Sequence, residues 1–381
     1  MLTLRLGAAC LVLAAASLSG CDSATRVDGT ATTFRTEGTD DPNAAVALSG
    51  GQIVVGALVE GVIAPADGTI GYPAVIQFDE DGAEAAVYDN GDRDFFGVDG
   101  IAALGNGLAI AIGSQDGAEI YRTDRRGRSR ERIARLDARF FPDDALRAIP
   151  GGLVVAAFPA EADSPHLYGL STSGAEQWTY RLPEAQDVRA VSVRPDGDLV
   201  VAGAGRRGGE ALVARLSPDG EERWRVELAA TSPTAISSTD EATVVVAEEQ
   251  PGGPPVLVRL GANGETLWTR SLADPTAADP EAAFGTRVLL LADGRSVVGV
   301  QTRNRDFESG NAARLVTVGA DGQVAHWVGI GEPGETSTFV QGLVALPDGR
   351  LGVVLAVGPK PFGGFGGDDF DIEVVRLGVP G

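Results

Sequence analysis

The sequence predicts an all-β protein, a seven-bladed β-propeller whose blades are four-stranded antiparallel sheets. Three observations lead to this prediction. A β-rich phrase occurs seven times, its copies are spaced by about 45 to 56 residues, and the 381 residues include 52 Gly and 21 Pro. Four short strands and their turns occupy about that length in a propeller blade. Glycine and proline at this frequency supply the many tight turns that such a fold requires.

Each copy of the phrase is a Gly-rich turn followed by a run of Val, Leu, Ile and Ala, which is typical of the second strand of a blade. These runs are Gly51–Gly56, Gly107–Gly113, Gly152–Ala157, Gly197–Gly203, Glu241–Ala247, Gly294–Val300 and Gly349–Leu355. A β-rich third strand follows each run. The predicted third strands are Ala74–Phe78, Ala118–Thr123, His166–Leu170, Ala211–Leu216, Val256–Leu260, Arg314–Val318 and Asp371–Leu377.

The strand count leaves one blade incomplete. A turn and a fourth strand follow six of the third strands, but after Leu377 the chain runs only to Gly381. A sheet edge without a partner is an aggregation risk, and the segment Ala31–Glu37 before the first blade is β-rich and otherwise unassigned. We therefore predict that this segment closes the ring as the outer strand of the last blade.

The N-terminus has the features of a bacterial lipoprotein signal. Arg5 supplies a positive charge, Leu6–Ser17 is apolar but too short to span a bilayer, and Leu18-Ser19-Gly20-Cys21 follows directly. This resembles the lipobox, and the resemblance implies that Cys21 becomes the lipidated first residue. The alternative is an ordinary cleaved signal with an incidental cysteine. The predicted organisation is a removed signal peptide at 1–20, a polar tether at 21–29 and the propeller at 30–381.

The charge balance bears on possible partners. The chain carries 53 acidic and 31 basic residues, a formal net charge of -22. A protein this acidic repels phosphate backbones, so nucleic acid is excluded as a partner. The excess of carboxylates could serve a cation or a basic partner, but it is more typical of a solubilising, salt-adapted exterior. The lipobox resemblance indicates one partner directly, which is the lipid bilayer reached through acylated Cys21.

Three predicted fourth strands share the pattern of a turn glycine followed four residues later by Trp: Gly174 with Trp178, Gly220 with Trp224, and Gly264 with Trp268. This pattern resembles the repeat of quinoprotein-like (PQQ-like) propellers, a family that includes an envelope lipoprotein of outer-membrane protein assembly. The resemblance implies a propeller fold in which these rings pack between neighbouring blades.

Sequence patterns for catalysis are sparse. We expect no cofactor, because a quinoprotein dehydrogenase needs metal-ligating groups and often paired cysteines, whereas Cys21 is the one cysteine of the mature chain. His166 and His326 are the two histidines, each in an expected strand, where a structural role is typical. Among short acidic runs, Asp89, Asp92 and Asp94 are the calcium candidates, although none of the runs matches an EF-hand loop. The competing interpretation is that these acidic runs are solvated turns, and we predict no bound metal.

Four arginines alternate with other residues between positions 126 and 132. Arg126, Arg128, Arg130 and Arg132 would share one face of the predicted outer strand of the second blade. Charges on an edge strand prevent unwanted strand pairing. The functional alternative is a basic docking stripe for anionic headgroups or an acidic partner.

Long connections are concentrated on one predicted face of the ring, in blades 1, 6 and 7. They carry aromatic and arginine side chains of the kind that anchor protein interfaces. These candidate interaction residues are Phe95, Phe96, Arg303, Arg305, Phe307, Phe362, Phe365 and Phe370. The sequence thus favours a lipid-anchored module of the bacterial cell envelope that binds an envelope protein partner. The alternative is an enzyme of hydrolase or lyase type with its site at the axial channel on the long-loop face.

Overall fold

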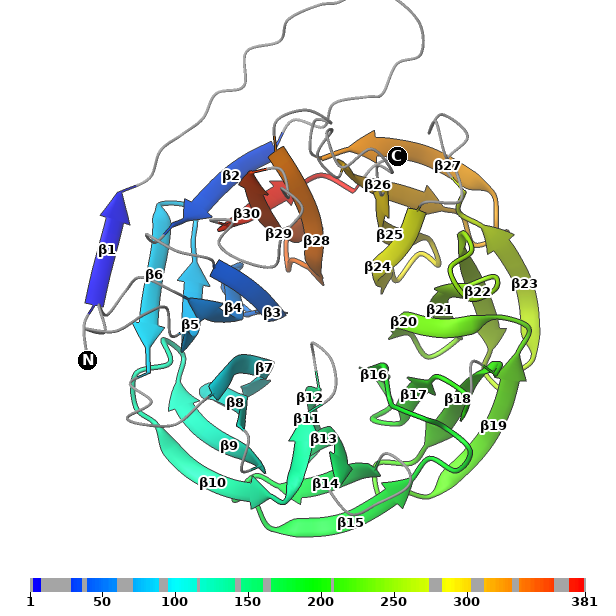
Figure 1. Ribbon diagram of the computed structural model, residues 1–381, viewed down its shortest axis with the longest axis horizontal. Helices are drawn as coiled ribbons and strands as arrows, with labels where there is room; N and C mark the ends of the chain where they lie inside the picture. The colour runs from blue at the N-terminus through cyan, green and yellow to red at the C-terminus, as the bar shows by residue number, and fades with distance from the viewer. Residues whose placement is uncertain are drawn as a thin grey trace, which may run out of the picture.

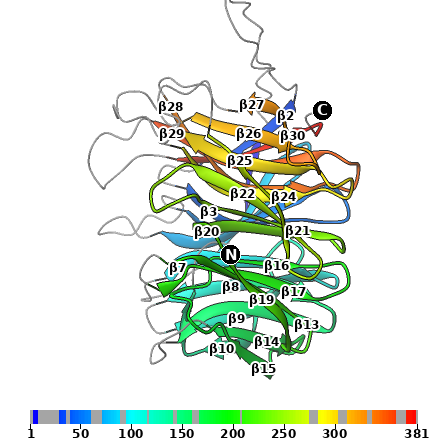
Figure 2. The same ribbon diagram turned by 90° about the vertical axis from the view of Figure 1, so that its right-hand side faces the viewer.

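The computed structural model describes residues 3–7, 29–35, 40–59, 71–88, 95–114, 117–140, 145–159, 166–206, 209–273, 283–302, 312–330, 336–359 and 370–379. Their strands form seven antiparallel sheets arranged radially as the blades of a propeller (Figures 1 and 2). This confirms the predicted fold. No helix that is both long and apolar enough to cross a membrane occurs within the described ranges.

The strands are layered from the axis outwards. The innermost strands are β3 (Asp40–Ala47), β7 (Phe95–Leu104), β12 (Leu146–Ile149), β16 (Ala190–Val193), β20 (Thr231–Ser238), β24 (Ala283–Leu290) and β28 (Thr336–Ala345). The second strands are β4 (Ile53–Val59), β8 (Gly107–Ser114), β13 (Gly152–Pro159), β17 (Leu199–Gly203), β21 (Ala242–Glu248), β25 (Ser296–Thr302) and β29 (Leu351–Pro359).

The outer half of each blade follows the same order. The third strands are β5 (Tyr72–Phe78), β9 (Gly117–Asp124), β14 (His166–Ser171), β18 (Ala211–Leu216), β22 (Pro255–Gly261), β26 (Ala312–Val318) and β30 (Asp371–Leu377). The outer strands that follow them in the chain are β6 (Gly82–Val87), β10 (Glu131–Leu136), β15 (Glu176–Arg181), β19 (Glu222–Leu228), β23 (Thr266–Ser271) and β27 (Val324–Gly329). A short additional strand, β11 (Ala138–Phe140), pairs with the end of β13.

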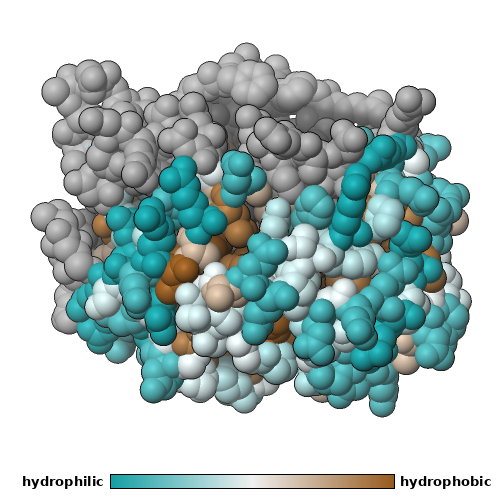
Figure 3. Space-filling model, turned by 90° about the horizontal axis from the view of Figure 1, so that it is seen from below, coloured by the Kyte–Doolittle hydropathy of each residue, from teal (hydrophilic) through white to brown (hydrophobic). Residues whose placement is uncertain are grey.

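Position in the blade explains the composition of each layer. The second strands are buried on both faces, as in β17 and β21, because each blade packs between two others. Two-sided burial favours continuous Val, Leu and Ala runs over strict alternation. The outer strands β15 and β23 are mostly exposed and carry polar side chains. The coloured part of the side seen in Figure 3 is accordingly largely hydrophilic, with smaller hydrophobic areas between the polar residues.

The N-terminal segment closes the ring as predicted. Strand β2 (Gly29–Phe34) pairs antiparallel with β30, so the last sheet has the order β2-β30-β29-β28. The strand begins two residues before the predicted segment. Phe34 is 2% exposed and lies in one hydrophobic cluster with Ile372 of blade 7 and Ile53 of blade 1. Arg35 Nε donates to the Asp371 carboxylate at 2.8 Å, which fixes the end of this pairing.

A second N-terminal strand lies on the outside of blade 1. Strand β1 (Thr3–Gly7) pairs antiparallel with β6 in the full chain. It falls within the segment that the sequence predicts to be removed as a signal peptide. Removal would leave β6 as the outer strand, so blade 1 of the mature protein would have the four strands β3 to β6.

The side chains of Trp178, Trp224 and Trp268 join neighbouring blades, as the repeat pattern predicted. Each indole Nε1 donates to a carbonyl in the turn of the next blade: Trp178 to Pro218 at 2.9 Å, Trp224 to Ala262 at 3.0 Å, and Trp268 to Ala320 at 2.9 Å. The ring of Trp268 also lies against Gly322, which has a φ of 81°; a Cβ there would be 3.0 Å from the indole. Glycine therefore satisfies both the turn and the close approach of the ring.

Candidate functional site: an arginine-lined axial pocket

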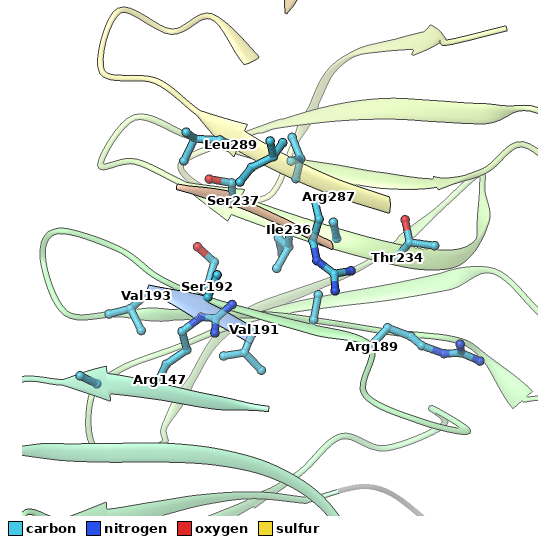
Figure 4. A pocket seen from close by; sticks show the side chains of 17 residues that line it. Arg147, Arg189, Val191, Ser192, Val193, Thr234, Ile236, Ser237, Arg287 and Leu289 are labelled. Atoms are coloured by element: carbon cyan, nitrogen blue, oxygen red, sulfur yellow. The ribbon is translucent and has the colours of Figure 1, made fainter. Parts of the chain in front are cut away.

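The innermost strands enclose a pocket on the propeller axis (Figure 4). Its described lining comes from β3, β12, β16, β20, β24 and β28 and their immediate neighbours, which belong to six of the seven blades. The cavity volume is about 270 Å³. Small side chains such as Ala148, Ala190, Ala235 and Gly342 line it and help to leave this space around the axis.

Three arginines line this pocket, from three different blades. Arg147 is in β12, Arg189 directly precedes β16, and Arg287 is in β24. Figure 4 shows the side chains of Arg147 and Arg287 extending into the pocket, whereas Arg189 points away from them. An arginine on an innermost strand interrupts an otherwise apolar run. Such an interruption is the sequence signal that could have indicated this site.

The contacts of these arginines differ. Arg287 Nε donates to the Gln341 carbonyl at 2.7 Å, and its Nη1 donates to the Thr286 carbonyl at 3.0 Å. Arg147 Nη1 donates to the Leu146 carbonyl at 3.1 Å. Arg189 forms an ion pair with the buried carboxylate of Asp187, with 2.7 Å between Nε and Oδ2. The bonds to carbonyl oxygens help to orient the guanidinium groups of Arg147 and Arg287.

The rest of the described lining combines hydroxyl groups with aliphatic walls. Ser192, Thr234 and Ser237 supply the hydroxyls, and Ser237 Oγ accepts a hydrogen bond from the Leu290 amide at 2.9 Å. Val191, Ile236 and Leu289 supply the apolar surface. The charged side chains among these described lining residues are all arginines. Such a site can bind and orient an anion, while proton transfer would require a further group.

Most of the predicted interaction residues lie outside the described part of the chain. This applies to Arg303, Arg305, Phe307, Phe362 and Phe365. The backbones of Phe95 and Phe96 open β7, whereas their side chains are not described. Phe370 is half-buried and packs edge-on against Phe339 of β28, with 5.7 Å between ring centroids. It therefore contributes to packing within blade 7.

The prediction that all four alternating arginines lie on the outer strand of blade 2 is wrong, because only Arg132 does. Strand β10 begins at Glu131, so Arg126, Arg128 and Arg130 lie in the turn before it. The cause is Asp124, whose Oδ1 accepts hydrogen bonds from the amides of Arg126 at 2.9 Å and Arg128 at 2.8 Å. An aspartate that bonds nearby amides in this way competes with strand pairing and lengthens the turn.

Arg128 and Arg130 instead join blades 1 and 2, while Arg132 makes its contact within blade 2. Arg128 is paired with Glu84 of β6. The Arg130 guanidinium carbon lies 4.9 Å from the ring centroid of Tyr88 and 4.7 Å from that of Tyr121, within cation-π range. Arg132 Nη1 lies 2.8 Å from the buried Glu119 carboxylate. Burial raises the pKa of the Tyr121 phenol, and its hydrogen bond to Glu119 raises it further.

The remaining sequence candidates concern metals, histidines and the lipid site. Asp89, Asp92, Asp94 and Cys21 lie outside the described residues. Within the described ranges, no three His, Cys, Asp or Glu residues gather as a metal site would require. Burial and the nearby Arg181 charge lower the pKa of His166 in β14. His326 is exposed in the outer strand β27, whereas the axial pocket is lined by innermost strands.

Comparisons with known proteins agree with this architecture. A family profile described as outer membrane protein assembly factor BamB matches residues 95–231 and 209–325, which together span more than half of the chain. This confirms the resemblance to PQQ-like repeat propellers. No curated protein matches the sequence.

Several solved structures share the fold at low identity. The Dos1 propeller has 9% identity and a TM-score of 0.58, covering 91% of this chain and 94% of that one. The β-propeller domain of the trilobed protease from Pyrococcus furiosus has 11% identity and a TM-score of 0.54, covering 86% and 94%. The WD40 domain of Toxoplasma gondii coronin has 10% identity and a TM-score of 0.54, covering 94% and 89%. At these identities the likeness concerns the fold alone.

Proposed function

Because the chain belongs to the family of the outer membrane protein assembly factor BamB, we propose that it is a protein-binding and scaffolding module of the bacterial cell envelope. The family match across the middle of the propeller carries this proposal. The N-terminal lipobox resemblance supports an envelope location, with lipidated Cys21 as the anchor.

The shape of the molecule supports a scaffolding role. A closed ring of seven sheets is a rigid body. Its outer strands, such as β15, are polar, so the loops that connect the strands are the parts that can make specific contacts with a partner. The axial pocket supports catalysis less well. Its described lining offers guanidinium and hydroxyl groups, and a hydrolase or lyase would also need a group that transfers protons there.

Crosslinking in native membranes tests partner binding. The chain has one lysine, Lys360, so amine-reactive reagents are unsuitable, and a photo-reactive amino acid at position 96 is the better probe. We expect position 96, at the start of β7, to crosslink to a distinct envelope protein. Phe95→Ala combined with Arg305→Ala should reduce that product several-fold, because aromatic and Arg anchors dominate interface energies.

The matched control places the same probe at Arg223, an exposed position on the outer strand β19. It should give no such product. The proposal is contradicted if positions 96 and 223 give the same crosslinked products, or if position 96 gives no product above background.

The anchor is tested separately by Cys21→Ala. Several acyl chains on one residue would give durable anchoring, because each buried methylene contributes about 0.8 kcal/mol. We therefore expect the wild-type chain to incorporate labelled palmitate and to sediment with membranes, and the variant to do neither. A variant that remains in the membrane fraction would show that Cys21 is not the anchor.

A further inference from the structure

One segment of the outer rim carries a charge opposite to that of the whole molecule. Residues 122–139, which we call the basic segment, contain eight arginines and three acidic residues, a formal charge of +5, whereas the whole chain carries -22. The segment includes the turn between β9 and β10, the third and outer strands of blade 2. Glu84 and Glu119 lie outside the segment and pair with its arginines, and counting both still leaves +3.

Contacts with blade 1 fix the turn of the basic segment. The Gly127 carbonyl accepts a hydrogen bond from the Tyr88 hydroxyl at 2.8 Å, and Arg128 is paired with Glu84. The Arg130 guanidinium lies over the Tyr88 ring, 4.9 Å from its centroid. These contacts hold the turn in one conformation. A charged surface that is already ordered loses little conformational entropy when it binds a partner.

Most arginines of the segment still present their charge to solvent. Those that are exposed in addition to Arg130 are Arg122, Arg125, Arg126, Arg132 and Arg135. Ion pairs within the protein leave the side chains of Arg126 and Arg132 53% and 51% exposed. A charged bilayer acts on the net charge near it, over about 10 Å at ordinary ionic strength. These arginines can therefore keep their contacts within the protein and still be attracted to such a surface.

The predicted lipid tether joins the ring on the same sector of the rim. Strand β2 begins at Gly29, which pairs with Leu377 at the end of β30, so the tether meets the ring at the outer edge of blade 7. Blade 1 lies between blades 7 and 2, and β6 lies between β2 and β10 on the rim (Figure 1). A chain from Cys21 to Gly29 spans at most about 28 Å. Acyl groups on Cys21 would therefore hold this sector close to a bilayer.

We propose that the basic segment docks on anionic phospholipid headgroups, so that blades 7, 1 and 2 of the anchored protein face the membrane and blade 4 faces away from it. Basic clusters beside an anchor bind anionic lipids because the phosphate oxygens match the guanidinium fork. This proposal rests on the anchor at Cys21 that belongs to the proposed function. Headgroup attraction supplements that anchor without replacing it, since a chain of net charge -22 is repelled overall. The expected release of Cys21→Ala from membranes is consistent with this.

Photo-crosslinking on vesicles tests the orientation. Cys21 is the one cysteine of the predicted mature chain, so its thiol can be coupled to a maleimide lipid that replaces native acylation. A photo-reactive amino acid at the exposed Ser129 then reports contact with lipid. We expect several-fold more lipid adducts on vesicles of phosphatidylglycerol and phosphatidylcholine than on vesicles of phosphatidylcholine alone. High salt should reduce this difference, because it screens the attraction.

Charge reversal identifies the residues responsible. Arg125→Glu combined with Arg126→Glu should lower the phosphatidylglycerol-dependent adducts at least about fivefold, which corresponds to the contribution of one arginine near an anionic surface. Arg125→Glu alone should act in the same direction, and it is the second variant should the pair disturb the contact with Glu84. The matched control is Arg223→Glu combined with Arg225→Glu, which reverses two exposed charges on β19 of blade 4. It should leave the yield within about twofold of the wild type.

The proposal is wrong if the adducts do not depend on phosphatidylglycerol, or if the control pair lowers them as much as the basic-segment pair does. The basic segment would then serve to join blades 1 and 2 or to bind an acidic protein. Because the anchor is made chemically, this experiment does not depend on native lipidation. Its failure is therefore distinguishable from a failure of the Cys21→Ala or position-96 experiments.

Discussion

Replacing Phe34 by alanine is expected to lower the free energy of unfolding by about 4 kcal/mol, the range measured for buried aromatic side chains. Phe34 is 2% exposed and packs in the cluster that joins the last blade to the first. The substitution removes apolar contacts from both blades and weakens the strand that closes the ring. Urea denaturation of the purified mature chain measures the change.

Thr33→Ala is the matched control for this prediction. Thr33 is the neighbouring residue of the same strand, pairs with Glu373 in the same ladder, and is exposed. Its substitution should change the free energy of unfolding by no more than about 0.5 kcal/mol. A loosened β2 would also leave β30 as an open edge, so Phe34→Ala should increase aggregation. Equal effects of the two variants would mean that this strand contributes no closing contact.

Replacing Trp268 by alanine is expected to lower the free energy of unfolding by about 3 kcal/mol. The indole packs against the hydrophobic cluster between blades 5 and 6, covers Gly322, and donates to the Ala320 carbonyl at 2.9 Å. Its loss removes both the packing and a net hydrogen-bond contribution of about 1 kcal/mol. Trp268→Phe retains much of the ring, so its cost should be well below that of alanine. Thermal and urea denaturation measure both.

The neighbouring Leu267 provides the control. It is 52% exposed and lies beside Trp268 in β23, so Leu267→Ala removes a large apolar side chain that has little packing to lose. We expect a change within about 0.5 kcal/mol. If Leu267→Ala lowers the free energy of unfolding as much as Trp268→Ala does, then both substitutions disturb the outer strand itself. The contact of Trp268 with the next blade would then not be the cause.

Local patterns predicted most of the strands because position in a blade determines composition. Third strands such as Ala211–Leu216 and Asp371–Leu377 have the predicted bounds. The arginine stripe was wrong for an equally local reason: Asp124 bonds two amides of the turn and delays the start of β10. A regular alternation of charges was therefore not sufficient to predict a strand.

The candidate site was less accessible to sequence reasoning. Arg147 and Arg287 are far apart in the chain, and each was one arginine in an apolar strand. Which face of an innermost strand meets the axis depends on its register and bulges, such as the shift between Gly285 and Arg287. These features arise from the packing of neighbouring blades.

The sequence by itself determined the repeat, the number of blades and the need for an additional closing strand, because turn residues and two-sided burial leave a pattern within each repeat. Only the tertiary structure decided which residues meet across blades. Phe34 meets Ile372 and Ile53, and arginines of separate blades line one axial pocket. Contacts between distant residues depend on the curvature and closure of the whole ring, and neither is encoded within any one repeat.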